Sequence, residues 1–205
     1  MPVLAGPTGV PLPAAPSLLT ATLQGGPQVS LTWRDNATTE TVFVLERSTD
    51  LGVTFVPVAT PPARANTGNV TYVDTLVKPA TAYQYRVMAV NGSGSSAYSS
   101  TSLTVTVPPL PSAPSGLVAS AINVNKNKET VTLTWTDNAS NETGFTIQRS
   151  TTAAFTTVTT STAAANATTF SQTGVARNQT FYYRVRASNL GGASAWSNVA
   201  SILTP

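Results

Sequence analysis

The acidic residues whose spacing suits chemistry come in two matching pairs, Asp35 with Glu40 and Asp137 with Glu142. Two neighbouring carboxylates could act as general acid and base, or could supply oxygen ligands to a calcium ion. Asp-Asn sequences also form turns, because the side chain accepts hydrogen bonds from nearby backbone N–H groups. Since two identical active sites in one chain would be unusual, we predict that the pairs shape turns.

The residue types that dominate catalysis and metal binding are missing from the sequence, which has 205 residues but no histidine and no cysteine. Histidine is the commonest general base and metal ligand, and thiolates are usual ligands of structural zinc. Without cysteine there is also no disulfide framework. We therefore expect a protein that is not an enzyme, with no catalytic residues, no cofactor and no metal ion.

The charge balance argues against two classes of partner. Eleven Lys and Arg residues against eight Asp and Glu residues give a net charge of +3, and the basic residues are scattered. Nucleic-acid-binding domains concentrate theirs in clusters. A membrane helix needs about 18 consecutive apolar residues, and no run approaches that length. We expect neither nucleic-acid binding nor membrane insertion.

Both acid pairs lie in a repeat that covers most of the chain. Trp33-Arg34-Asp35-Asn36-Ala37 recurs 102 residues later as Trp135-Thr136-Asp137-Asn138-Ala139, and Tyr85-Arg86-Val87 recurs 98 residues later as Tyr183-Arg184-Val185. Loops between matched segments can differ in length in homologous domains. The repeat predicts two domains of one fold.

Each copy has the pattern of short β-strands. Val29, Leu31 and Trp33 alternate with polar residues, and such alternation is typical of strands with one buried face. The expected strands are 18–24, 28–34, 42–48, 53–59, 69–74, 82–91 and 98–107 in the first copy, and 116–122, 129–136, 144–150, 154–160, 167–172, 180–189 and 196–203 in the second. This pattern predicts an all-β chain of two consecutive seven-stranded immunoglobulin-like β-sandwiches.

Proline-rich stretches suggest the domain borders. Residues 1–15 form a Pro/Gly-rich arm or linker, either a plain terminus or an extended arm that lies along a neighbouring chain's sheet edge. The first domain then covers 16–107, a Pro-rich linker covers 108–113, and the second domain covers 114–205. A proline-rich joint of this kind is a stiff spacer.

Both copies resemble fibronectin type III domains, over about residues 16–107 and 113–204. The features that carry the resemblance are an opening proline, the tryptophan of the second strand, and the Tyr-Arg-Val-x-Ala-x-Asn sequences that begin at Tyr85 and Tyr183. The stretch 137–150 resembles the variety found in prokaryotic extracellular proteins. The resemblance implies a tyrosine-corner hydrogen bond at Tyr83, which its counterpart Phe181 cannot form because it lacks a hydroxyl.

The two copies differ most at outward positions of the third and sixth expected strands. In the first copy these positions are apolar: Val42, Val44, Met88 and Val90. In the second they are Gly144, Thr146, Arg186 and Ser188. The two strands are neighbours in the expected fold, so the first set should form one exposed apolar patch. Such patches usually mark contact surfaces, whereas the alternative is that these residues serve strand propensity alone.

The sequence therefore predicts a non-catalytic, extracellular or cell-surface structural and interaction module, a spacer or adhesion module of a larger surface or secreted protein. A protein partner or self-association is expected. One alternative is a self-assembling subunit of an extracellular filament or surface layer. The other is a carbohydrate-binding accessory module of a secreted glycoside hydrolase, which would need exposed aromatic side chains. Only Tyr98, Tyr182 and Trp196 are left for that role. An export signal is expected outside this sequence, which begins without one.

Overall fold

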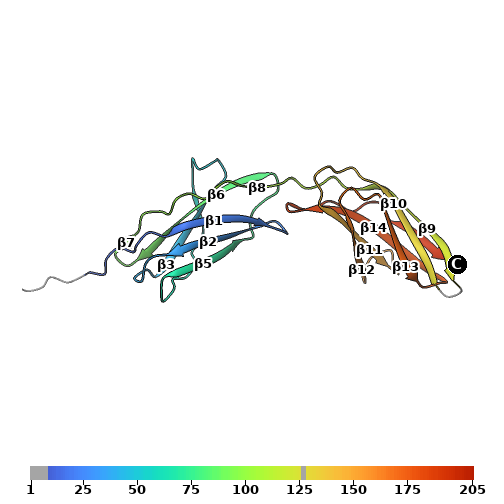
Figure 1. The fold of residues 1–205 in the computed structure, drawn as a ribbon, viewed down its shortest axis with the longest axis horizontal. Coiled ribbons are helices and arrows are strands. Elements are labelled where there is room, and N and C mark those ends of the chain that lie inside the picture. The colour runs from blue at the N-terminus through green and yellow to red at the C-terminus, as the bar shows by residue number, and fades with distance from the viewer. Residues whose placement is uncertain (1–8, 126–127) are drawn as a thin grey trace, which may run out of the picture. The chain divides into compact units, whose positions relative to one another are not determined.

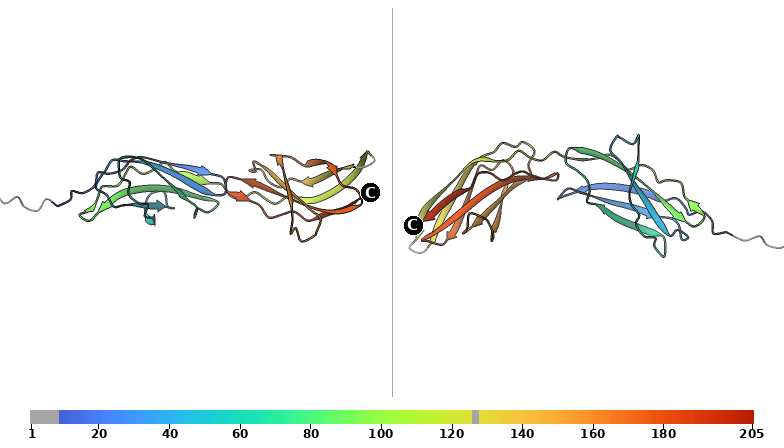
Figure 2. Two further views of the ribbon diagram at one scale, coloured as in Figure 1. Left: turned by 90° about the horizontal axis from the view of Figure 1, so that it is seen from below. Right: turned by 180° about the vertical axis from the view of Figure 1, so that it is seen from behind.

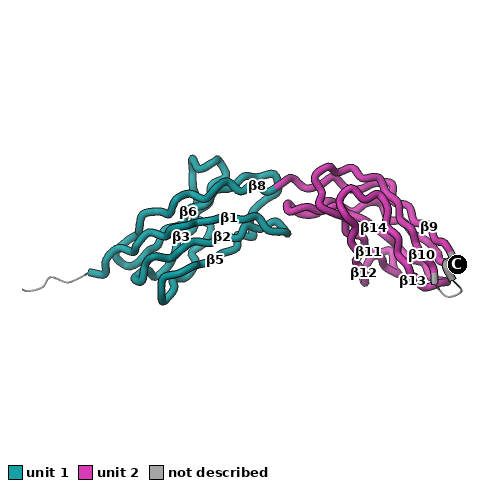
Figure 3. The backbone as a smooth tube through the Cα atoms, in the orientation of Figure 1, with its two compact units in different colours: residues 1–107 teal, residues 108–205 magenta. Residues whose placement is uncertain are grey.

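The structure, a computed structural model, describes residues 9–125 and 128–205 (Figure 1). All regular elements in these ranges are β-strands, and no helix there could cross a membrane. Residues 1–107 and 108–205 form two compact units (Figure 3). Residues 1–8 of the predicted arm lie outside the described ranges.

Unit 1 is a sandwich of two antiparallel sheets. One sheet has the order β1-β2-β5, and the other has the order β4-β3-β6-β7, with β8 also paired to β6. Core residues from both sheets pack together, which places the core between them. The strands are β1 (Ser17–Gln24), β2 (Gln28–Asp35), β3 (Val42–Ser48), β4 (Val56–Ala59), β5 (Gly68–Asp74), β6 (Thr81–Asn91), β7 (Gly94–Ser95) and β8 (Val105–Val107).

Unit 2 repeats this plan, and Figure 2 shows the strands of each unit from two further sides. Its sheets have the orders β13-β10-β9 and β12-β11-β14-β15, with β16 also paired to β14. The strands are β9 (Ser115–Asn125), β10 (Lys128–Thr136), β11 (Gly144–Ser150), β12 (Thr159–Ala164), β13 (Thr169–Val175), β14 (Gln179–Asn189), β15 (Gly192–Ala193) and β16 (Ala200–Thr204). The predicted all-β class and pair of immunoglobulin-like sandwiches are confirmed.

A buried tryptophan anchors each core. Trp33 is fully buried and meets the ring of Phe43 at 5.5 Å between centroids, with the rings 70° apart. Trp135 and Phe145 repeat the contact at 5.5 Å and 57°. The first pair is edge-on and the second is tilted, and aromatic pairs of this kind add about 0.5–1.5 kcal/mol to the gain from burial. The alternation that ends at each tryptophan therefore marks the core-facing side of β2 and β10.

The expected last strand of each copy was wrong over part of its length. Residues 98–104 and 196–199 are not in regular strands, and only β8 and β16 remain of the two predictions. These segments pair with β6 and β14 through serines at every third position, and not through the regular hydrogen bonds of a strand.

Ser96, Ser99 and Ser102 donate their backbone N–H groups to carbonyls of β6, and their hydroxyls accept hydrogen bonds from N–H groups of β6. Ser194 and Ser197 do the same for β14. A repeat of three residues suits a polyproline-like path rather than the two-residue repeat of a strand. The hydroxyls thus take the acceptor role that strand carbonyls would have filled.

The strands expected at 53–59 and 154–160 begin later than predicted, at Val56 and Thr159. In unit 1 the Asp50 carboxylate accepts the Thr54 N–H and holds the preceding loop away from the sheet. In unit 2 the Phe155 N–H closes a turn onto the Thr152 carbonyl, and Phe155 has a φ of 52°. Local turn bonds therefore compete with the sheet at both sites.

The proline-rich stretch before β1 is fastened to unit 1 by two asparagine amides. Asn91 Nδ2 donates to the Pro11 carbonyl at 2.7 Å, and Asn36 Nδ2 donates to the Ala15 carbonyl at 2.8 Å. The matching amides in unit 2 are those of Asn189 and Asn138, which donate to Pro109 and Ala113 at 2.9 Å each. Carbonyls that have no sheet partner are satisfied in this way.

The tyrosine-corner bond is present in unit 1, where the Lys78 N–H donates to the Tyr83 hydroxyl at 2.8 Å. Tyr83 is almost fully buried. Phe181 occupies the matching place in unit 2 and has only a ring, over which the Arg149 guanidinium lies at 5.0 Å.

We predict that Tyr83→Phe destabilises unit 1 by about 1 kcal/mol, because the Lys78 N–H, whose bond is partly buried, loses its acceptor. Urea unfolding of the full chain and hydrogen exchange at the Lys78 amide measure the effect. Tyr72→Phe is the matched control, since no hydrogen bond in the described part of the chain involves its hydroxyl. Unchanged protection of the Lys78 amide in Tyr83→Phe would contradict the prediction.

Candidate functional site

The four apolar residues proposed as a patch occupy paired positions on the outer face of unit 1. Val42 of β3 lies directly opposite Val90 of β6, and Val44 lies directly opposite Met88. All four side chains are half-buried, and each alternates with a core residue. The structure thus brings them together, while their role as a contact surface stays a prediction.

Beside this patch, Arg86 is held by a carboxylate and two rings. Its guanidinium pairs with Glu46 at 2.6 Å and lies over Phe55 and Tyr98 at 4.2 and 3.9 Å from the ring centres. The Tyr98 hydroxyl donates to the other Glu46 oxygen at 2.9 Å. The two rings lie 31 and 12 residues from Arg86 along the chain, so their contact with it could not be predicted from the sequence.

The loop before β4 positions Phe55 over Arg86. Ser48 Oγ donates to Asp50 at 2.7 Å, and the N–H and hydroxyl of Thr54 donate to the same carboxylate. These hydrogen bonds, led by that of Ser48, lower the pKa of Asp50 to about 2. Asp50 is therefore charged at all ordinary pH values and keeps the loop closed.

The matching face of unit 2 has the same stack with different charges. Arg184 lies over Phe155 and Trp196 at 4.2 and 4.3 Å, and Arg186 lies over Trp196 at 4.4 Å. Gln148 replaces the glutamate and accepts hydrogen bonds from Arg184 at 2.9 and 2.6 Å. This face therefore carries the positive charges of two arginines, whereas on the same face of unit 1 the charge of Arg86 is neutralised by Glu46.

The acid pair of unit 1 is buried. Asp35 is fully buried, Glu40 is 7% exposed, and one Asp35 oxygen accepts the Ala37 N–H at 3.0 Å. Burial raises the pKa of Asp35, the Ala37 bond lowers it, and the nearby Glu40 carboxylate raises it further. The backbone bond two residues on is the turn contact that the sequence predicted.

The pair in unit 2 is arranged more openly. Asp137 is half-buried and accepts the Ala139 N–H at 3.0 Å, while Glu142 accepts the Asn166 N–H at 2.9 Å. Among the described residues, no three His, Cys, Asp or Glu side chains gather as a metal site would require. Asp35, Asp137 and Glu142 thus accept backbone N–H groups of turns, whereas the buried Glu40 oxygens have no hydrogen-bond partner among the described residues.

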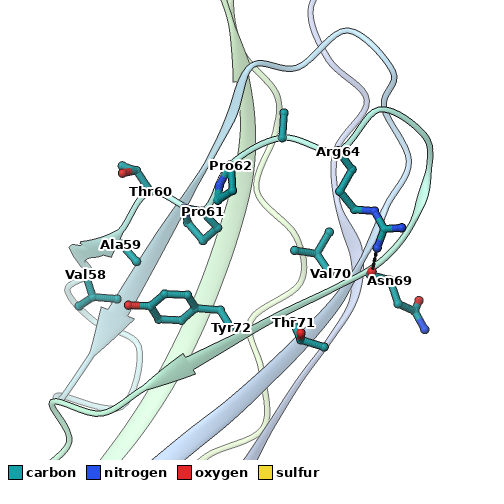
Figure 4. A pocket seen from close by; sticks show the side chains of 11 residues that line it. Val58, Ala59, Thr60, Pro61, Pro62, Arg64, Asn69, Val70, Thr71 and Tyr72 are labelled. Carbon is teal, nitrogen blue, oxygen red and sulfur yellow. Dashed lines mark hydrogen bonds between the residues drawn. The ribbon is translucent and has the colours of Figure 1, made fainter.

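A hollow that the sequence did not predict opens in unit 1 between β4 and β5, with a volume of about 590 Å³ (Figure 4). Val58, Pro61, Val70 and Tyr72 supply much of its wall. Arg64 lies at one end and donates to the Asn69 carbonyl. Strands β4 and β5 each pair with one neighbour only, so the hollow lies along an open edge of the sandwich.

We predict that Asp35→Asn stabilises the chain more near neutral pH than near pH 4. Because the pKa of Asp35 is raised in the folded state, its protonated form stabilises the fold below the unfolded pKa of about 3.9. This contribution is lost as the pH rises through the folded-state pKa of Asp35. Asn keeps an oxygen for the Ala37 N–H. Urea unfolding across this pH range gives the difference, with Asp137→Asn as control. If the stability gained by Asp35→Asn falls as the pH rises, the pKa of Asp35 is not raised in the folded state.

Comparison with known proteins supports the architecture. No protein-family model matches the chain, and no curated protein sequence matches it. A crystal structure of the FN1–FN3 domains of chicken CNTN1 superimposes with a TM-score of 0.63 and 18% sequence identity, covering 96% of this chain and 69% of that one. At this sequence identity the match shows only that the two chains share a fold. With two sandwiches of matching strand order, the chain has the fold of tandem fibronectin type III domains.

Proposed function

We propose that the chain is a non-catalytic structural and interaction module, a spacer or adhesion module of a larger surface or secreted protein. The observation that carries this proposal is the outer face of unit 1, where Val42–Val90 and Val44–Met88 are directly opposed apolar pairs. The same face of unit 2 has Thr146 opposite Arg186. One framework therefore presents two different outward surfaces, as expected of modules that hold and display contact faces.

The use of the polar side chains supports a structural role. Asp35 and Asp137 bond to the backbone of turns, Asn36 and Asn138 fasten the proline-rich stretches, and Arg86 is enclosed by its own partners. These groups are used to build the fold. A catalytic group needs instead a free position next to a substrate.

The proposed extracellular location rests on the surface chemistry. Only 9% of residues are charged, whereas soluble domains average about 25%. Hydroxyl side chains cover outward positions instead, as on β10, where Thr130, Thr132 and Thr134 alternate with core residues. Neutral polar surfaces of this kind are common among secreted and cell-surface proteins.

Self-assembly into a filament or layer is the second candidate, and it uses the same apolar pairs as a contact between copies. A binding site built on exposed aromatic rings has less support. Arg86 lies over Tyr98, and both Arg184 and Arg186 lie over Trp196, so these rings are engaged within their own units.

We predict that the wild-type chain self-associates through the apolar pairs and that Val44→Thr with Met88→Thr weakens the association about tenfold or more, because two apolar side chains lose burial. Sedimentation equilibrium over a wide concentration range measures it. Val73→Thr is the control, since Val73 is an exposed valine on the other sheet of the same unit. Equal association of wild type and double variant would remove this face from the proposal.

A further inference from the structure

The positive charge of the chain belongs to unit 2. Residues 1–107 contain five basic and five acidic residues, whereas residues 108–205 contain six basic and three acidic residues. Two acidic positions of unit 1 hold neutral glutamines in unit 2. Glu46 corresponds to Gln148, and Asp74, which accepts a hydrogen bond from Tyr85, corresponds to Gln172, which accepts one from Tyr183.

The outer face of unit 2 concentrates this change. Arg184 and Arg186 both lie over Trp196, and no carboxylate among the described residues pairs with either. Burial and the neighbouring charge of Arg186 lower the pKa of Arg184. Two like charges fixed on one ring repel each other, and a bound anion would relieve that repulsion.

Arg186 has free donors. No hydrogen bond in the described part of the chain involves its guanidinium, and its Nε is buried without a partner. The Trp196 ring fixes the orientation of the group in advance. A guanidinium that is held in place and unpaired is suited to a carboxylate, which accepts two parallel N–H bonds.

A polar hollow lies beside Arg186 on the same face. It has a volume of about 410 Å³, and its lining residues include Gly144 of β11, Thr162 of β12 and Ser188 of β14. Gly144 lies opposite Ser188, and the next outward pair along the strands is Thr146 with Arg186. Thr146 and Thr162 line the hollow, and no hydrogen bond within the described residues uses their hydroxyls.

Unit 1 has different outward residues at the matching positions of the third and sixth strands. Val42 and Val90 stand where unit 2 has Gly144 and Ser188, and Met88 stands where unit 2 has Arg186. Unit 2 therefore has a hydroxyl at Thr146 and a cation at Arg186 where unit 1 has the apolar Val44 and Met88.

We propose that this face binds a hexuronate unit of an anionic polysaccharide. The sugar ring occupies the hollow with its hydroxyls on Thr146 and Thr162, and the ring carboxylate reaches Arg186. Outward neighbours two positions apart on a strand are about 6.6 Å apart, a distance that one sugar ring with its carboxylate can span. The hollow offers a sugar side-chain hydroxyls across the paired strands β11 and β12, whereas a peptide strand would add instead along the outer edge of β12, which pairs with β11 alone.

Isothermal titration of the full chain with oligogalacturonate, and with a neutral glucose oligomer of equal length, tests the proposal. We expect binding of the uronate alone, weakened by added salt. Arg186→Met should lower the affinity about tenfold to hundredfold, since a charge-assisted hydrogen-bonded pair is lost, and Thr146→Val should lower it less. Arg64→Met, which removes an exposed arginine of unit 1, is the matched control and should bind as wild type does.

Equal affinity of Arg186→Met and wild type overturns the proposal, as does equal binding of the neutral oligomer. Tighter binding of polyglutamate than of the uronate also overturns it and assigns the face to an acidic protein. Melting temperatures of all variants are compared so that a folding defect is recognised. The proposal is independent of the apolar pairs of unit 1, since Val44→Thr with Met88→Thr should leave uronate binding unchanged.

Discussion

Each domain depends on burying one large tryptophan between two sheets. Trp33 and Trp135 come from the central strands of their three-stranded sheets and reach across to Phe43 and Phe145 of the opposite sheets. A pair of rings of this size spans much of the roughly 10 Å between packed sheets. Once the pair is in place, the alternation along β2, β3 and β6 decides which residues face inward and which are left for contact with the surroundings.

This constraint explains what the sequence could predict and what it could not. Strands such as β2, β3 and β6 follow the two-residue alternation closely, and they were predicted to within a residue or two. The segments that contain Ser96 to Ser102 and Ser194 to Ser197 pair through side-chain hydroxyls at every third residue. This three-residue pattern does not appear as two-residue alternation. In these segments a serine hydroxyl accepts the N–H that a backbone carbonyl accepts in a regular strand pair.

The candidate surfaces, like the strands, could be predicted from the sequence only in part. The neighbourhood of Val44 and Met88 could be inferred from sequence, since both strands are regular and the fold pairs them. The stack of Phe155, Arg184 and Trp196 could not, because it joins a loop, a strand and a non-strand segment. The hollow at Gly144 could not be predicted from the sequence either, since residues of β11, β12 and β14 line it together.

Comparing the two units separates the demands of the fold from those of the surface. Inward residues are kept in kind, as with Leu45 and Ile147 in the two cores. Outward residues change in charge and size while the backbone register stays the same, so Val44 opposite Met88 becomes Thr146 opposite Arg186. Because an outward side chain on a strand contributes little to the core, such changes cost little stability. One sandwich can thus display an apolar face and its relative a cationic one without a change of architecture, and differences between the units in what they bind should follow from these outward pairs.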